Sequence, residues 1–222
     1  LFLGFVTKAG LLVDNGQADI WVGHRKMHNV DFPRDIPRRW ISRIRGIPDV
    51  KSAEPYLIGM TNMTLPSGGF EEVVVVGVEP VSLMGNVWNI TQGRADAILQ
   101  ADGIIVDDCE LEKLEYPALG DQRELGGRRA RIVGMSHGVM GFLVAPYAFT
   151  TFEQAAVYLK KDPGACSYIL VEVQPGADVD KVCAALARRV PDADVYPREV
   201  YSQISTDFWM TRTGLGISLG AA

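Results

Sequence analysis

The sequence predicts an α+β fold in which two similar strand–helix–strand units form one subdomain and a small β-rich block is inserted between them. The helices of the two units end in related sequences, Arg45-Gly46-Ile47-Pro48-Asp49 and Arg188-Arg189-Val190-Pro191-Asp192. The residues between the units are rich in glycine and in short β-branched runs, a pattern typical of β-rich structure. We interpret the units as two copies of one supersecondary element, each with a right-handed crossover onto a shared or neighbouring sheet.

The first unit opens with a strand over residues 18–23. A helix is expected next, with Asp35 as its N-cap and Pro37 in its first turn, where a missing N–H costs little. Gly46 and Pro48 end this helix. Its apolar residues recur every three or four positions; they are Ile36, Trp40, Ile41, Ile44 and Ile47. Residues 50–65 and 70–78 then predict a long hairpin around the turn Pro66-Ser67-Gly68-Gly69.

The second unit repeats this order. Residues 167–174 predict a strand, and Asp178 caps a helix that Pro191 and Asp192 end. The apolar face of that helix consists of Val179, Val182, Cys183, Leu186 and Val190. Residues 193–196 predict the closing strand.

The middle block is expected to contain short elements separated by glycines. Residues 103–107, 130–134 and 139–144 predict strands, and residues 110–116 predict one or two helical turns. A helix is expected over residues 149–161, with Phe152, Ala155, Ala156 and Leu159 on one side.

Composition places the chain among folded domains and outside the nucleic-acid binders. The 222 residues are 47% apolar and 22% charged, which suffices for one large or two small cores. The net charge of −5 lacks the basic excess of a nucleic-acid-binding domain. The local cluster of Arg123, Arg128, Arg129 and Arg131 is interpreted as a solvated face.

Three cysteines, Cys109, Cys166 and Cys183, do not form a disulfide framework, because they are sparse and odd in number. A single bridge between Cys166 and Cys183 stays open as an alternative. Cys183 lies on the apolar face of the predicted helix, which favours a buried free thiol.

Apolar residues gather at both ends of the sequence, in residues 1–6 and again from Phe208 to Leu219. Neither stretch reaches the roughly 20 residues that cross a bilayer. We therefore expect a domain excised from between two membrane spans, with the alternative that both ends belong to the core. The excised-domain hypothesis requires the segments near Val13 and Phe208 to emerge side by side.

The motifs that resemble catalytic or metal sites are weak. Gly134-Met135-Ser136-His137-Gly138 matches the G-x-S-x-G nucleophile elbow, but strand or loop rather than helix is expected after it, and no histidine follows residue 137. His24 and His28 have a metal-ligand spacing, yet they lie in a basic loop. The acidic residues Asp107, Asp108 and Glu110 are interpreted as a solvated surface. We predict no catalytic, cofactor-binding or metal-binding residues.

The ordered set of motifs along the chain resembles the extracytoplasmic domain of MacB/FtsX-type ABC transporter permeases, and within them the DevC-like permeases. The resemblance covers nearly the whole chain. The matching segments are residues 18–22, 46–50 with 54–55, 75–80, 105–107, 119–121, 132–134, 173–179, and 208–209 with 213–216.

The resemblance implies a division of the chain. Residues 1–14 would end a first membrane span or form a juxtamembrane helix, and residues 208–222 would begin a second span. Residues 15–84 and 149–207 would form the two halves of a porter-like subdomain. Residues 85–148 would form an inserted Sabre-like subdomain, an assignment that depends on position alone.

The implied function is mechanotransmission without chemistry in this domain, on the extracytoplasmic side of the inner membrane. The implied partners are a cytoplasmic ATPase, a second permease subunit and a periplasmic adaptor protein. The turn formed by Pro66, Ser67, Gly68 and Gly69 is a candidate adaptor contact, against the alternative of a plain solvent turn. Two other functions stay open: a membrane-tethered ligand-binding or sensing module, and a serine hydrolase that uses Ser136.

Overall fold

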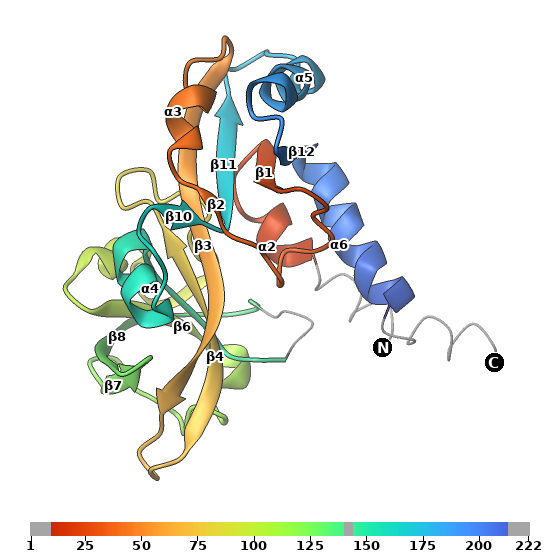
Figure 1. Ribbon diagram of the computed structural model, residues 1–222. Helices are drawn as coiled ribbons and strands as arrows, with labels where there is room; N and C mark the ends of the chain where they lie inside the picture. Colours follow the sequence, from red (N-terminus) through yellow and green to blue (C-terminus); the bar gives the residue numbers. More distant parts are fainter. Residues whose placement is uncertain (1–9, 140–143, 213–222) are drawn as a thin grey trace.

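The computed structural model describes residues 10–139 and 144–212 (Figure 1). The helices are α2 (Leu11–Asp14), α3 (Trp40–Ile44), α4 (Phe152–Leu159), α5 (Val179–Arg189) and α6 (Arg198–Arg212), with 3-10 helices η2 (Ala95–Leu99) and η3 (Asp108–Glu110). The strands are β1 (Ile20–His24), β2 (Ile36–Pro37), β3 (Val50–Thr64), β4 (Phe70–Val78), β5 (Ile90–Gly93), β6 (Gly103–Asp107), β7 (Gln122–Leu125), β8 (Arg128–Ser136), β9 (Tyr147–Thr151), β10 (Ala165–Cys166), β11 (Tyr168–Val173) and β12 (Ala193–Pro197).

Most strands join one mixed sheet, in the order β12-β1-β11-β3-β4-β9-β6-β8-β5, with β7 beside β3 and β8. At one end of this sheet the two predicted strand–helix–strand units interleave. β11 lies between the parallel strands β1 and β3, and β1 lies between the parallel strands β11 and β12. This is the ferredoxin-like split βαβ arrangement. The α+β class is confirmed, and the two units share a single sheet.

The β3–β4 hairpin connects this part to the rest of the molecule (Figure 1). The first half of β3 pairs with β11, and its far end pairs with β7. β4 pairs in parallel with β9, which continues through β6 to β8. Because one sheet runs through both parts, main-chain hydrogen bonds link them directly. The subdomain boundaries at residues 84/85 and 148/149 remain a prediction.

The two faces of the sheet are covered by different helices. Strand side chains alternate between the faces, so that Ile20 and Val22 of β1 pack with one core cluster and Trp21 packs with the other. Helices α3, α4 and α5 cover the first face. The second face is covered by α2, by α6 and by the loops that follow β1 and β4.

The helix expected from Asp35 is wrong at its start. Ile36 and Pro37 form strand β2, which pairs with β10, and the helix is confined to Trp40–Ile44. Asp35 does not cap it but pairs with Lys161 at 2.8 Å. Proline fits a short edge strand because its missing N–H is no loss there. The apolar spacing is explained by burial, since Ile36 packs into the same cluster as the helix.

The helix expected over residues 149–161 is also too long at its start. Residues up to Thr151 complete β9, a fully buried strand, and the helix begins at Phe152. Thr151 Oγ1 accepts the N-cap bond from the Gln154 amide at 3.4 Å. Glu110 ends η3, and residues 111–115 continue as hydrogen-bonded turns, in agreement with the one or two helical turns expected over residues 110–116. The strand expected over residues 139–144 falls mostly outside the described residues.

The three cysteines are free thiols in the structure. Cys166 is buried, while Cys109 and Cys183 are half-buried. The bridge between Cys166 and Cys183 is therefore not formed, and the expected burial of Cys183 is only partial.

A glycine in β4 determines how closely α4 approaches the sheet. A Cβ atom at Gly77 would lie 2.4 Å from Ala155 Cβ and 3.2 Å from Phe152 Cα. We predict that Gly77→Ala lowers the free energy of unfolding by about 1–3 kcal/mol, because the core has no room for the added methyl group. The measurement is urea denaturation.

The matched control is Gly46→Ala, where a Cβ would meet nothing closer than 3.7 Å. This control should be neutral or slightly stabilising. Equal effects of the two substitutions would contradict the proposed role of Gly77 in packing.

Candidate functional site

The short helix α2 and the long helix α6 lie side by side against the same face of the sheet (Figure 1). Gly10, the N-cap of α2, meets α6 so closely that a Cβ there would lie 2.4 Å from Ser202 Oγ and 3.5 Å from Ser202 Cβ. The neighbouring residues Leu12, Val13 and Tyr201 are buried. The placement of this domain between two membrane spans remains a prediction. Among the described residues, no helix combines the length and hydropathy needed to span a bilayer.

Helix α6 packs against an aromatic cluster on the sheet. Trp21 of β1 lies at its centre, with ring-centroid distances of 5.4 Å to Tyr56 of β3, 5.3 Å to Tyr168 of β11 and 5.6 Å to Tyr201 of α6. All four side chains are fully buried. Edge-to-face contacts of this kind add to the free energy gained by burial. Tyr201 thus anchors α6 on β1 and β11, through Trp21 and Tyr168.

Hydrogen bonds fix the loop after β1 to the same helix. The Tyr201 hydroxyl donates to the Asn29 carbonyl oxygen at 2.8 Å, and Tyr168 Oη lies 3.0 Å from that oxygen. Asn29 Oδ1 in turn accepts from the amides of Asp31 and Phe32, each at 2.9 Å. The loop is therefore held in one conformation that presents Asp31 to the far end of α6.

Asp31 is a buried carboxylate that binds α6. Its Oδ2 accepts a hydrogen bond from Trp209 Nε1 at 3.0 Å, and the Phe32 ring lies 5.7 Å from the Trp209 ring. Burial raises the pKa of Asp31 to about 6, although the hydrogen bond from Trp209 opposes that rise. We name the set Asn29, Asp31, Tyr168, Tyr201 and Trp209 the α6 clasp.

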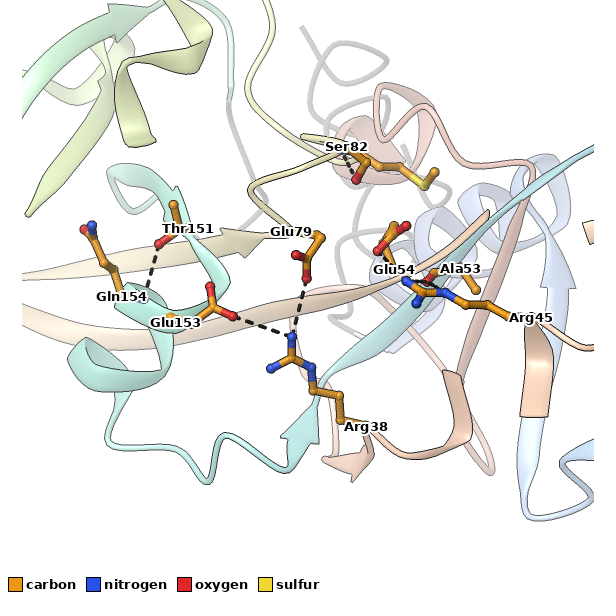
Figure 2. Close-up of polar contacts among 10 residues, drawn as sticks. Arg38, Arg45, Ala53, Glu54, Glu79, Ser82, Thr151, Glu153 and Gln154 are labelled. Atoms are coloured by element: carbon orange, nitrogen blue, oxygen red, sulfur yellow. Dashed lines mark hydrogen bonds and ion pairs between the residues drawn. The ribbon is translucent and has the colours of Figure 1, made fainter. Parts of the chain in front are cut away.

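A second contact joins the two parts of the molecule across the other face of the sheet (Figure 2). The Arg38 guanidinium, next to β2, lies 3.4 Å from Glu79 Oε2 at the end of β4 and 3.5 Å from Glu153 Oε1 on α4. It also sits over the Phe152 ring, 4.4 Å from the centroid. Arg45 bonds Glu54 at 3.0 Å and the Ala53 carbonyl oxygen at 2.8 Å.

These residues border an open groove of about 730 Å³ that includes Arg38, Arg45 and Glu79 in its lining. The ligand-binding alternative would be favoured by buried polar groups that converge on an apolar cleft. Here the charged groups bind one another, and Arg38 remains about one-third exposed. The charged residues at this groove therefore serve to join β2, β4 and α4. The groove gives no specific support to the alternative of a ligand-binding or sensing module.

The predicted partner contact lies at the far tip of the β3–β4 hairpin (Figure 1). Pro66, Ser67, Gly68 and Gly69 are all exposed, and Gly68 has the left-handed φ of +89° that this turn requires. The Ser67 amide donates to Glu115 Oε2 at 3.0 Å, which ties the tip to the middle block. Phe70 beside the tip is 68% exposed. The role of the tip as a contact remains a prediction.

The hydrolase alternative finds no matching geometry in the described residues. Ser136 is fully buried and donates to Asp107 Oδ2 at 2.7 Å. The adjacent His137 contacts Asp108 instead, with Nδ1 2.5 Å from Oδ1. The other two histidines lie elsewhere: His24 Nδ1 is 2.6 Å from the Arg25 carbonyl oxygen, and the His28 ring stacks on Phe208.

Sequence reasoning missed the α6 clasp. Asp31 and Trp209 are 178 positions apart, and nothing local indicates their contact. The one signal available was the placement of two aromatic residues, Tyr201 and Trp209, eight positions apart, in a part of the chain for which no helix was predicted. At 3.6 residues per turn, eight positions are offset by about 80°, which lies within one broad apolar stripe of a helix.

Comparison with known families and solved structures identifies proteins that are similar to this chain. The profile of a family described as MacB-like periplasmic core domain matches residues 7–189. A search among curated protein sequences gave no match.

Three solved structures share the fold. The periplasmic region of MacB from Actinobacillus actinomycetemcomitans has a TM-score of 0.65 at 9% identity, covering 85% of this chain and 92% of that one. The extracellular domain of the noncanonic ABC-type transporter YknZ from Gram-positive bacteria has a TM-score of 0.59 at 12% identity, with 80% and 98% covered. A domain of a putative permease protein from Porphyromonas gingivalis has a TM-score of 0.53 at 17% identity, with 82% and 91% covered.

Burial of Asp31 generates a prediction about pH. The pKa of about 6 in the folded state lies above the ordinary 3.8, so the folded state binds more protons than the unfolded state between these values. The contribution of Asp31 to the free energy of unfolding therefore falls as pH rises from about 4 to about 6. Asp31→Asn keeps an oxygen for Trp209 and removes the buried charge. We expect the free energy of unfolding of the variant to exceed that of the parent by up to about 3 kcal/mol at about pH 7.5. At about pH 4 the two values should be equal.

Urea denaturation at both pH values checks this expectation. Asp192→Asn, at an exposed position after α5, is the control and should behave as the parent at both. A stability gain of Asp31→Asn that is the same at both pH values, or a loss at about pH 7.5, would contradict the assigned role of the carboxylate.

Proposed function

Because the chain belongs to the MacB-like periplasmic core domain family, we propose that it transmits motion between the membrane part of an ABC transporter permease and partners outside the membrane. The chain is an extracytoplasmic domain of a MacB-like permease. We propose further that it carries out no catalysis and binds no catalytic cofactor. ATP would be hydrolysed by a cytoplasmic ATPase, and the domain would respond by a rigid-body movement.

The observation that carries the proposal is the joint docking of α2 and α6 on one face of the sheet. A membrane span that continued either helix would act on the sheet directly. The contact consists of close backbone approach at Gly10 and of the aromatic and hydrogen-bonded α6 clasp. Closely packed interfaces of this kind move as units and do not deform gradually.

The β3–β4 hairpin would carry the movement outward. β3 has 15 residues, a length of about 50 Å at ~3.3 Å per residue. Its base pairs with β11, next to the strand that carries Trp21, and its tip exposes Ser67 and Phe70. A small rotation at the base therefore becomes a larger displacement at the tip.

The partners in this proposal follow from the family and from two solved structures of similar fold, which come from an ABC-type transporter and a putative permease protein. We propose a cytoplasmic ATPase, a second permease subunit and an adaptor protein that contacts the hairpin tip. The placement between two spans of an inner-membrane, DevC-like efflux permease is part of the same proposal.

The proposal is tested in the full-length permease assembled with its ATPase. Spin labels at Ser67→Cys in the two subunits report the distance between the hairpin tips. We expect this distance to change when ATP binds under conditions that prevent hydrolysis. Trp209→Ala should reduce the change strongly, because it removes the indole that joins α6 to Asp31.

Val200→Ala is the matched control, since Val200 lies on the same helix and is 45% exposed. It should leave the change in tip distance intact. Tips that stay at one distance in both nucleotide states, or a Trp209→Ala permease that moves like the parent, would overturn the proposal.

A further inference from the structure

The ends of two neighbouring parallel strands bring a mixed set of metal-ligand side chains together. β6 and β8 run parallel, with Asp107 opposite Ser136 as their last residues. The residues that follow these strands are Asp108, Cys109 and His137. Their ligand atoms, a carboxylate oxygen, Sγ and a ring nitrogen, all lie within 4.8 Å of one another. Carboxyl ends of adjacent parallel strands are a common place for ligand sites.

A buried carboxylate organises this cluster. Asp107, 1% exposed, accepts hydrogen bonds at Oδ2 from Ser136 Oγ at 2.7 Å and from the Val139 amide at 3.0 Å. Its Oδ1 accepts from the Cys109 amide at 3.1 Å. One side chain thus fixes the loop that carries Cys109 relative to the loop that carries His137. Support of this kind from residues behind the ligands is what orients metal ligands in known sites.

From this geometry we propose that Asp108, Cys109 and His137 bind a divalent transition-metal ion of the zinc type, with a water molecule as the fourth ligand. Thiolate, imidazole and carboxylate are the three donor types that zinc uses, and three protein ligands plus water is an established coordination. Around a tetrahedral ion with bonds of about 2.0–2.3 Å, ligand atoms lie roughly 3–4 Å apart. The three ligand atoms, all within 4.8 Å of one another, lie close to that range.

The charges around the cluster favour a cation. Two carboxylates adjoin the cluster: Asp108 Oδ1 lies 2.5 Å from His137 Nδ1, and Asp107 Oδ1 accepts from the Cys109 amide at 3.1 Å. A divalent ion would compensate this negative charge.

The site also explains the sequence around Ser136. The resemblance to a nucleophile elbow depends on Gly134, Ser136 and Gly138, but the serine hydroxyl is bound to Asp107. In the proposed site Ser136 is a positioning residue that holds Asp107, and the adjacent His137 is a ligand.

The test titrates the reduced 222-residue chain with Co²⁺, and then displaces it with Zn²⁺. We expect one equivalent of Co²⁺ to produce a thiolate-to-cobalt charge-transfer absorption that Zn²⁺ abolishes. Cys109→Ser should remove this absorption, and His137→Ala should weaken binding by well over tenfold. Ser136→Ala should weaken it by about 10–100-fold while the absorption keeps its shape, which distinguishes positioning from ligation.

Cys183→Ser and His28→Ala are the matched controls, since both residues lie outside the cluster. They should bind Co²⁺ like the parent. Circular dichroism of each metal-free variant verifies its fold before titration. Absence of the charge-transfer absorption in the folded parent chain, or its persistence in Cys109→Ser, would overturn the proposal.

Discussion

Main-chain pairing along β3 is the interaction on which the rest of the structure depends. Its first half pairs with β11 in the ferredoxin-like part, and its partner β4 pairs with β9 in the rest of the sheet. The two parts are therefore not separate bodies joined by a linker but regions of one hydrogen-bonded surface. On each face, helices then bury the apolar side chains that the alternation of β3 and its neighbours presents.

Because the α6 clasp is attached to this shared sheet, helix α6 is connected to several strands and not to one. Trp21, Tyr56 and Tyr168 come from three adjacent strands, and Tyr201 packs on Trp21 and Tyr168. A force on α6 is spread over several strands at once. The buried carboxylate of Asp31 adds a directional contact at the other end of the helix. Its burial is costly, which suggests that orientation of α6 rather than stability is its main contribution.

Local patterns in the sequence predict the regular elements well. The structure confirms the strands predicted from the apolar runs of β1, β3 and β11, the turn before Phe70 and the Asp178 cap of α5. Each of these signals involves residues that are close together in the sequence. The errors arise where tertiary pairing competes with a local signal. Ile36 has helical spacing to Trp40 but pairs with Cys166 in a distant segment.

The candidate sites were even harder to predict from local sequence patterns, because their residues are far apart in the sequence. The clasp joins Asn29 to Tyr201, and the metal-type cluster joins Cys109 to His137, across long stretches of sequence. Ser136 illustrates the converse, because its local motif suggests a nucleophile whereas its real partner is Asp107 on another strand. Residue types predict what chemistry is available, but only the topology of the sheet decides which residues meet.

The central claim is that α2, α6 and the sheet move as one body when the transporter works. Gly10 and Ser202 allow this to be tested by a disulfide, because their Cβ positions lie 3.5 Å apart, within the range that a bridge accepts. The measurement is the rate of cross-linking of Gly10→Cys with Ser202→Cys, in a full-length permease whose native cysteines are replaced, with and without ATP. We expect equally fast cross-linking in both nucleotide states. Cross-linking in only one state would show that the helices separate during the cycle and would contradict the claim.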